Sequence, residues 1–337
     1  MTPLASTLHE EFLMIPLPLY LKLLVPGYRA KWRTRYACML AELHALAAQL
    51  SYGEEDGTPW IDLRDANIRL FGFCTEKKNI EVHKILHGAL PASIPRDHFR
   101  LVKDCLNRYI YPHMRPDLKP AGFSSEAMFG FHGQHKDSIA DLADAELRAR
   151  LTQAFMPKAD EIIIDCGPFL GFGEMQIAPD VQGGHIYAVE ADRTCHALLE
   201  RNVAHNKIGN VTALHRAVWH SETELDLQSD FAQANSLVSE VHKGVTVERV
   251  QTISVDKIVE TYDLKKLDML SLTLNGAEVE AIEGAQKTLK EFRPRIRLAG
   301  WYSRGGRKIS AITKDQLEAL GYQVFIGPRD NTMALPK

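Results

Sequence analysis

Apolar residues follow two different periods along this chain, and the period changes near residue 158. Before that point, apolar side chains recur every three or four residues in an Ala-rich stretch at Leu40, Leu43, Leu46 and Leu50. Leu147, Leu151 and Phe155 repeat this spacing just ahead of the change. Such spacing places side chains on one face of a helix. We therefore predict a mainly helical N-terminal domain over residues 1–157, with a Pro- and Gly-rich loop region at 112–133.

After residue 158, short apolar runs alternate with helical patterns. The runs that predict strands are 161–165, 185–190, 211–218, 247–254, 269–274, 295–300 and 323–326. Helices are predicted at 192–206, with Asp192 as the N-cap, and at 277–292. This alternation is typical of a parallel sheet covered on both faces, so residues 158–337 are predicted to form a doubly wound α/β domain. Ligands bind such sheets at the carboxyl ends of the strands, where the strand order reverses.

Composition narrows the class of protein. The chain has 337 residues and a formal net charge of −3, which fits two domains and gives no electrostatic case for a nucleic-acid partner. Its five cysteines are scattered without a C-x-x-C pair, so neither a disulfide framework nor a zinc site is predicted. This cysteine usage favours a cytoplasmic location.

The apolar segment at residues 12–25 contains prolines and a lysine and follows two glutamates, which argues against a signal peptide. A bilayer span takes about 20 apolar residues, and this segment is shorter. Four basic residues follow between positions 29 and 35. Two interpretations remain open for residues 12–35: packing on the domain itself, or contact with an anionic membrane surface.

A glycine-rich turn follows the first predicted strand of the α/β domain, with the sequence DCGPFLGFG at residues 165–173. Glu190 ends the next strand, where a carboxylate can accept both hydroxyls of an adenosine ribose. Dinucleotide-binding turns have the spacing G-x-G-x-x-G, whereas Gly167, Gly171 and Gly173 follow G-x-x-x-G-x-G. Pro168 also removes an N–H that a phosphate would need. The turn therefore favours S-adenosylmethionine, which carries an ammonium and no phosphate, over NAD.

The segment from about 161 to 327 resembles the FkbM family of S-adenosylmethionine-dependent methyltransferases. The matching stretches are IIIDCGPFLGFGE, IYAVEADRTCHALLERNVAHN, VTALHRAVW, VQTISVDKI, LDMLSLTLNGAEVEAIEGAQKTL and RPRIRLAGW. The resemblance implies a Rossmann-like class I methyltransferase sheet and methylation of an oxygen, often a hydroxyl of a sugar or natural product. It also implies a set of cofactor-binding residues, namely Asp165, Gly167, Phe169, Gly171, Glu190, Ala191, Asp192, Arg216 and Ala217.

The chain departs from the family pattern at the strand end that faces the methyl group. The family block K-I-D-x-E-G-A-E places an Asp and a Glu where this chain has Thr273 and Asn275. Three interpretations follow: another residue is the base, the acceptor needs no base, or the domain binds the cofactor without turnover.

His132 and His135 are the candidate replacements, since they lie in a loop-rich stretch where this fold class commonly builds a lid, and imidazole has a suitable pKa. Ordinary surface roles and a metal site are the alternatives for this pair, but no third ligand is evident, so no metal is predicted. Trp301 and Tyr302 are candidates for a wall of the acceptor site.

The sequence thus predicts a methyltransferase whose acceptor is a hydroxyl on a small molecule or glycan, with an N-terminal domain that covers the site and selects the acceptor. A non-catalytic protein that binds S-adenosylmethionine is the alternative, and an NAD-dependent oxidoreductase is a third possibility that the glycine spacing disfavours. The acceptor and the oligomeric state are left open.

Overall fold

The computed structural model describes residues 50–63, 68–73, 144–229, 235–238, 247–327 and 330–337, together with 24–27, 29–30, 98 and 101. The chain divides into two compact units, Met1–Leu106 and Asn107–Lys337. Among the described residues, no helix combines the length and apolar character needed to cross a bilayer.

The described part of the first unit contains an antiparallel sheet of three strands, β1 (Leu50–Glu55), β2 (Thr58–Leu63) and β3 (Ile68–Phe71). The β1–β2 turn holds Asp56 and Gly57 at φ angles of 51° and 71°. Two successive positive φ angles are typical of the tight hairpin turns that Asp-Gly pairs form. This sheet corrects the prediction of a mainly helical N-terminal part over residues 50–71. Leu50, expected to end a helical stripe, lies in β1.

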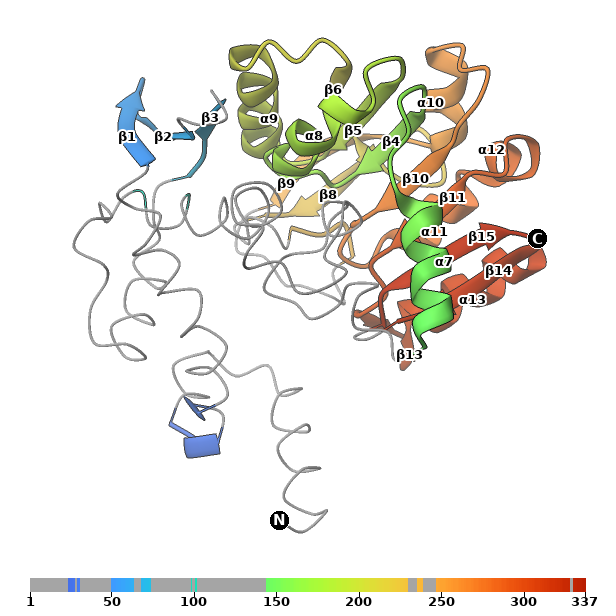
Figure 1. Cartoon of the computed structure of the whole chain (residues 1–337). Coiled ribbons are helices and arrows are strands. Elements are labelled where there is room, and N and C mark those ends of the chain that lie inside the picture. Colours follow the sequence, from blue (N-terminus) through green and yellow to red (C-terminus); the bar gives the residue numbers. More distant parts are fainter. Residues whose placement is uncertain are drawn as a thin grey trace. The chain divides into compact units, whose positions relative to one another are not determined.

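The second unit is built on a sheet of seven strands (Figure 1). In chain order the strands are β4 (Ile162–Cys166), β5 (His185–Glu190), β6 (Val211–His215), β10 (Met269–Leu272), β11 (Arg295–Leu298), β14 (Tyr322–Ile326) and β15 (Thr332–Pro336). Their order across the sheet is β14-β15-β11-β10-β4-β5-β6. β15 runs in the direction opposite to that of the other strands, so its pairs with β14 and β11 are antiparallel and the remaining pairs are parallel. The strand order reverses between β4 and β10. This is the place where open α/β sheets bind ligands.

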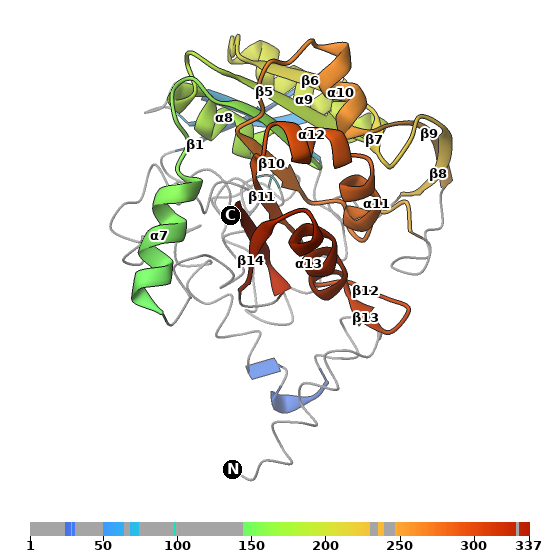
Figure 2. The same ribbon diagram turned by 90° about the vertical axis from the view of Figure 1, so that its right-hand side faces the viewer.

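Helices cover both faces of this sheet because successive strand residues point to opposite faces (Figures 1 and 2). Ile163, Ile186 and Met269 pack with α7 (Ala145–Phe155), α8 (Phe172–Ile177), the short helix η7 (Ala178–Asp180) and α9 (Arg193–His205). Ile164 and Leu270 pack with α10 (Val255–Thr261), α11 (Glu278–Glu283), α12 (Gln286–Glu291) and α13 (Ile309–Ala319). The doubly wound α/β fold predicted from the sequence is confirmed.

Several elements differ from the prediction in detail. The predicted strand at 247–254 is β9 (Val247–Ile253), which joins β7 (Ala217–Val218) and β8 (Glu224–Gln228) in a separate sheet rather than the main one. The helix predicted at 277–292 consists of α11 and α12. A hairpin of β12 (Ser303–Arg304) and β13 (Arg307–Lys308) follows β11. α7, placed before the domain boundary by the sequence, packs on the main sheet through Leu151 and Phe155.

Candidate functional site

A pocket opens at the carboxyl ends of β4, β5 and β10, with about 530 Å³ of empty space including its mouth. The predicted site residues that line it are Gly167, Phe169, Glu190, Ala191, Arg216, Ala217, Thr273 and Asn275. Asp165, Gly171 and Asp192 do not line it. His132 and His135 lie outside the described residues.

The turn after β4 lies in close contact with the neighbouring strands. The Gly167 N–H donates to the Val189 carbonyl at 2.9 Å, and the Thr273 N–H donates to the Cys166 carbonyl at 2.8 Å. Gly167 has a φ of 87°, and a Cβ built there would lie 2.1 Å from the Thr273 carbonyl oxygen. No side chain fits at this position. Glycine is therefore required here by the approach of two backbones.

Phe169, in the same turn, takes a left-handed conformation with a φ of 62°, although it is not a glycine. Its ring is buried, and its N–H donates to Glu190 Oε2 at 3.0 Å. A left-handed residue with a Cβ costs roughly 1–2 kcal/mol. Backbone strain of this kind is commonly stored at functional sites, and here it presents an N–H to the carboxylate of the pocket.

Glu190 ends β5 with a carboxylate that is 9% exposed. Its second oxygen, Oε1, accepts the Asp192 N–H at 3.0 Å, so backbone donors fix the carboxylate from both sides. Burial raises the pKa of Glu190 to about 7, and the nearby Asp192 charge adds to the rise.

Asp192 caps α9 as predicted, with its Oδ1 accepting the Cys195 N–H at 2.8 Å. Its other oxygen accepts the Asn235 side-chain amide at 2.9 Å. Asn235 and Leu237 themselves line the pocket, and the sequence analysis missed both. They belong to the segment 235–238, which we call the strap; no motif marks it in the sequence.

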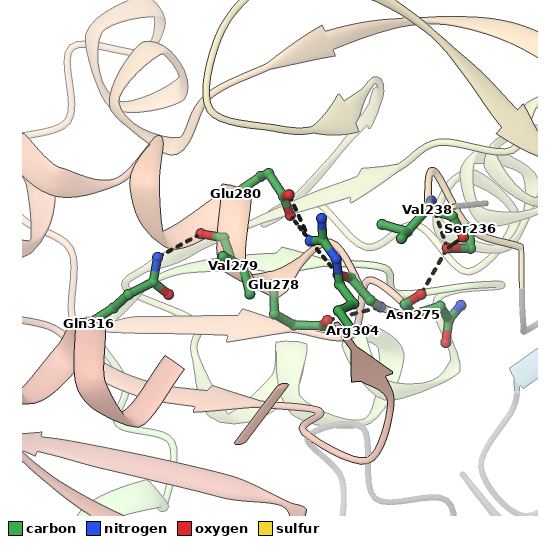
Figure 3. Close-up of polar contacts among 9 residues, drawn as sticks. Ser236, Val238, Asn275, Glu278, Val279, Glu280, Arg304 and Gln316 are labelled. Atoms are coloured by element: carbon green, nitrogen blue, oxygen red, sulfur yellow. Dashed lines mark hydrogen bonds and ion pairs between the residues drawn. The ribbon is translucent and has the colours of Figure 1, made fainter. Parts of the chain in front are cut away.

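Asn275 lies at the opposite rim, with a left-handed φ of 52° that an Asn tolerates better than most residues. Its amide donates to the Asn235 carbonyl at 2.9 Å and accepts the Tyr302 hydroxyl at 3.3 Å. The Asn275 carbonyl accepts the Ser236 hydroxyl at 2.8 Å, a contact visible in Figure 3. The strap thus connects the rim at Asp192 with the rim at Asn275.

A buried carboxylate holds the loop that carries Asn275. Glu278, fully buried at the start of α11, accepts the N–H groups of Leu274 and Gly276 at 2.8 and 2.9 Å. Burial raises the pKa of Glu278 to about 7. Figure 3 also shows Arg304 reaching Glu280, at 2.7 Å, from the β12–β13 hairpin. Arg304 also donates to the Gly276 carbonyl at 3.3 Å, so the hairpin contacts the loop that carries Asn275.

Tyr302, a candidate for the acceptor wall in the sequence analysis, lies beside Asn275 but is not among the residues that line the pocket. Burial raises its pKa to about 12, so its hydroxyl stays protonated at neutral pH and donates to Asn275. The adjacent Trp301 is partly buried and keeps its ring 6.1 Å from that of Tyr302.

The remaining predicted residues lie beneath or beside the pocket. Asp165 is 8% exposed in β4, in register with Ser271 of β10. Gly171 begins α8, and a Cβ built there would meet the Leu199 side chain at 2.4 Å. In this structure the position of Gly171 reflects packing of α8 against α9 rather than contact with the pocket.

The pocket offers distinct chemistry at its two ends. The lining residues Ala191, Ala217, Leu227 and Leu237 belong to one apolar cluster, and Ala191 directly follows Glu190 in the chain. Apolar walls suit a flat base, and a carboxylate beside them suits sugar hydroxyls. At the other end Thr273 and Asn275 present neutral polar groups. The lining therefore fits a nucleoside that extends towards a second, uncharged rim.

Comparison with known proteins gives one family match. Residues 175–324 match the family model described as "Methyltransferase FkbM domain". No curated protein matches the chain.

Among solved structures, similar ones include methyltransferase FkbM from Methylobacillus flagellatus KT, with 15% sequence identity and a TM-score of 0.41 over 54% of this chain and 44% of that one. This chain therefore spans less than half of the length of that protein. Precorrin-6y C5,15-methyltransferase from Geobacter metallireducens GS-15 shares 14% identity with a TM-score of 0.36, over 58% of this chain and 90% of that one. The fibrillarin pre-rRNA processing protein of Methanococcus jannaschii shares 18% identity with a TM-score of 0.35, over 56% of this chain and 73% of that one.

The family match begins in α8 and ends in β14, so it covers the strap, both rims of the pocket and most of the main sheet. The resemblance to the FkbM family that the sequence indicated is thus confirmed by a match to the methyltransferase FkbM domain over residues 175–324.

Proposed function

We propose that this chain is an S-adenosylmethionine-dependent methyltransferase that methylates a hydroxyl oxygen of a sugar or natural product. The observation that carries the proposal is the pocket itself, in which the tight Gly167 turn and the buried Glu190 carboxylate lie together at the switch point of the sheet. The family match supports methyl transfer, and the apolar walls beside Glu190 support a nucleoside-bearing donor.

Several of the predicted residues then have a role in binding. Glu190 accepts the ribose hydroxyls, as its position at the end of β5 suits. Asp165 faces the ammonium of the methionine end, and Ala191, Ala217 and Arg216 border the adenine. S-adenosylmethionine supplies a methyl group on a positively charged sulfur, which leaves as a neutral thioether.

The chain's own contribution to the reaction is mainly alignment and exclusion of water, because a displacement of this kind needs the acceptor oxygen in line with the methyl group. Thr273 and Asn275 border the acceptor side and hold no group that is basic at neutral pH. We assign the removal of the hydroxyl proton to His132 or His135, and acceptor selection to the N-terminal domain.

A second candidate function is cofactor binding without turnover. It is favoured by one observation: the Asn275 amide already bonds to Asn235 and Tyr302, so this rim is neutral and internally satisfied.

The experiment that separates these candidates is transfer of a deuterated methyl group. The protein is incubated with labelled S-adenosylmethionine and a panel of hydroxylated acceptors, including sugars and phenols, and the products are analysed by mass spectrometry. Labelled methyl on a hydroxyl oxygen supports the proposal. Tight binding of S-adenosylhomocysteine with no labelled product supports the non-catalytic function, and binding of NAD alone contradicts both.

A further inference from the structure

The loop 273–277, which we call the β10 loop because it follows β10, forms one wall of the pocket. Four of its five residues line the pocket, namely Thr273, Leu274, Asn275 and Ala277. Within the loop, Asn275 and Gly276 take successive positive φ angles of 52° and 114°. A residue with a side chain persists in this conformation only where its surroundings fix it, and such residues cluster at active sites and ligand clamps. The contacts that fix the β10 loop therefore determine the shape of this wall.

Glu278 fixes the β10 loop from the protein interior. Its side chain is fully buried, and its Oε1 accepts the Leu274 N–H at 2.8 Å while its Oε2 accepts the Gly276 N–H at 2.9 Å. These two N–H groups belong to the residues on either side of Asn275. The Asn275 carbonyl is held as well, because it accepts the Ser236 hydroxyl at 2.8 Å. One buried carboxylate thus fixes the backbone before and after the residue that lines the pocket.

Arg304 fixes the same loop from a second element, the β12–β13 hairpin (Figure 3). Its Nη1 donates to the Gly276 carbonyl at 3.3 Å and to both carboxylate oxygens of Glu280 at 2.7 Å. The Arg304 side chain is 26% exposed and that of Glu280 is 11% exposed, so the ion pair is partly shielded from water. The pair joins the hairpin to α11 and holds the guanidinium against the loop.

We propose that Glu278 and Arg304 are positioning residues for methyl transfer, which fix the β10 loop so that the acceptor meets the methyl donor in line. The proposal rests on the proposed function, since that function places the acceptor beside Thr273 and Asn275. Neither Glu278 nor Arg304 lines the pocket, so each acts through the loop and needs no contact with a ligand. The alternative is that their bonds only stabilise the start of α11.

Steady-state kinetics with the acceptor found by labelled methyl transfer separates these roles. Glu278→Gln keeps the shape of the side chain but has one oxygen, so one loop N–H loses its acceptor. We expect kcat to fall by about 10- to 100-fold, because a small misplacement of the reacting groups has an effect of this size. Calorimetric affinity for S-adenosylhomocysteine should stay nearly unchanged, since separate bonds hold the Glu190 carboxylate.

Asp268→Asn is the matched control for Glu278→Gln. Asp268 also accepts a backbone N–H, that of Ile162 at 2.8 Å, but it lies at the opposite end of β10 from the loop. This variant should leave kcat unchanged.

A second pair of variants covers the case in which Glu278→Gln does not fold. Arg304→Met removes one hydrogen bond to the β10 loop, so kcat should fall by about 2- to 12-fold. Arg307→Met is its control, because Arg307 lies in the same hairpin and bonds to Asp315 at an exposed position instead, at 2.7 Å. It should leave kcat unchanged.

Melting temperatures measured on the same variants distinguish a structural role. A lower Tm with unchanged kcat in Glu278→Gln or Arg304→Met would overturn the positioning role of that residue. A parallel fall in kcat and in affinity for S-adenosylhomocysteine would also overturn it, since the whole pocket would then be distorted. If the wild type binds S-adenosylhomocysteine but methylates no acceptor, the proposed function itself fails, and the positioning role fails with it.

Discussion

Two residues that line the pocket, Phe169 and Asn275, hold left-handed backbone conformations without being glycine. Asn275 suits this conformation because its short amide can bond locally, and it does so with Asn235 and Tyr302. Phe169 gains no such relief, and its conformation is maintained by burial of the ring and by the bond from its N–H to Glu190. The strain at Phe169 is therefore linked directly to the orientation of the Glu190 carboxylate.

At Gly167 the left-handed backbone conformation disfavours a side chain, and the nearby Thr273 carbonyl leaves no room for one. We expect Gly167→Ala to lower the free energy of unfolding by roughly 2–5 kcal/mol, from the left-handed conformation and the contact with the Thr273 carbonyl together. Urea denaturation followed by circular dichroism measures this loss. Gly209→Ala is the control, because nothing lies within 4 Å of a Cβ at that exposed position. Equal stability of the two variants would contradict the geometry.

The buried carboxyl groups of Glu190 and Glu278 should make the free energy of unfolding depend on pH. Burial raises the pKa of each from 4.5 to about 7, so the folded protein holds protons that the unfolded chain releases between these values. The free energy of unfolding should therefore fall, on account of these two groups, as the pH rises from about 4.5 to 7. In Glu190→Gln and Glu278→Gln that fall should be smaller than in the wild type. Denaturation curves at pH 5 and pH 8 test this, and an unchanged difference in either variant would argue against its assigned pKa.

At the scale of elements, the strap is the feature that connects the two ends of the pocket. Asn235→Ala removes the donor to Asp192 but keeps the backbone carbonyl that accepts the Asn275 amide. One net hydrogen bond is worth about 0.5–1.5 kcal/mol, so affinity for S-adenosylhomocysteine should fall by roughly 2- to 12-fold in calorimetry.

A matched variant controls for the loss of an amide in the same subdomain. Gln251→Ala removes a side-chain amide that donates to Glu224 at 3.1 Å on the exposed side of β9. It should leave the affinity for S-adenosylhomocysteine unchanged. If Asn235→Ala behaves like Gln251→Ala, the strap has no part in cofactor binding.

The elements that could be predicted from the sequence are those whose residues bury a complete face. Ile162–Cys166 and His185–Glu190 are continuous apolar runs that end in polar residues, and they appear as β4 and β5. β15 was not predicted, because its run TMALP ends in Pro336 and lies at the end of the chain. The β1–β2 hairpin was not predicted although Asp56-Gly57 signals its turn, since the leucine spacing before it indicated helix.

At the scale of the whole molecule, the site combines residues that local patterns can and cannot identify. The Gly167 turn and Glu190 follow a motif, so they could be predicted with their positions in the pocket. Asn235 and Leu237 could not, because the strap is held at the pocket by its bridge to Gln228 of β8 and by its bonds to Asp192 and Asn275, all of which are distant in the sequence. Such a position depends on tertiary structure and leaves no period in the sequence.

The assignment of a base is a prediction about residues outside the described part of the chain. If His132 or His135 takes the acceptor's proton, its replacement by Ala should lower turnover by about 10²–10⁴-fold with cofactor affinity nearly unchanged. Steady-state kinetics with the acceptor found by labelled methyl transfer measures this. His205→Ala, at an exposed position in the last turn of α9, is the control. Unchanged turnover in both variants would place the base elsewhere or make one unnecessary.

The central claim, that the Glu190 pocket binds S-adenosylmethionine, is tested most directly by calorimetric titration of S-adenosylhomocysteine into the wild type and Glu190→Ala side by side. We expect the wild type to bind and the folded variant to bind more than tenfold more weakly, since a charged acceptor of buried hydroxyls is typically worth about 1.5–3 kcal/mol. Equal affinity of the two proteins, or binding of NAD in place of S-adenosylhomocysteine, would contradict the claim.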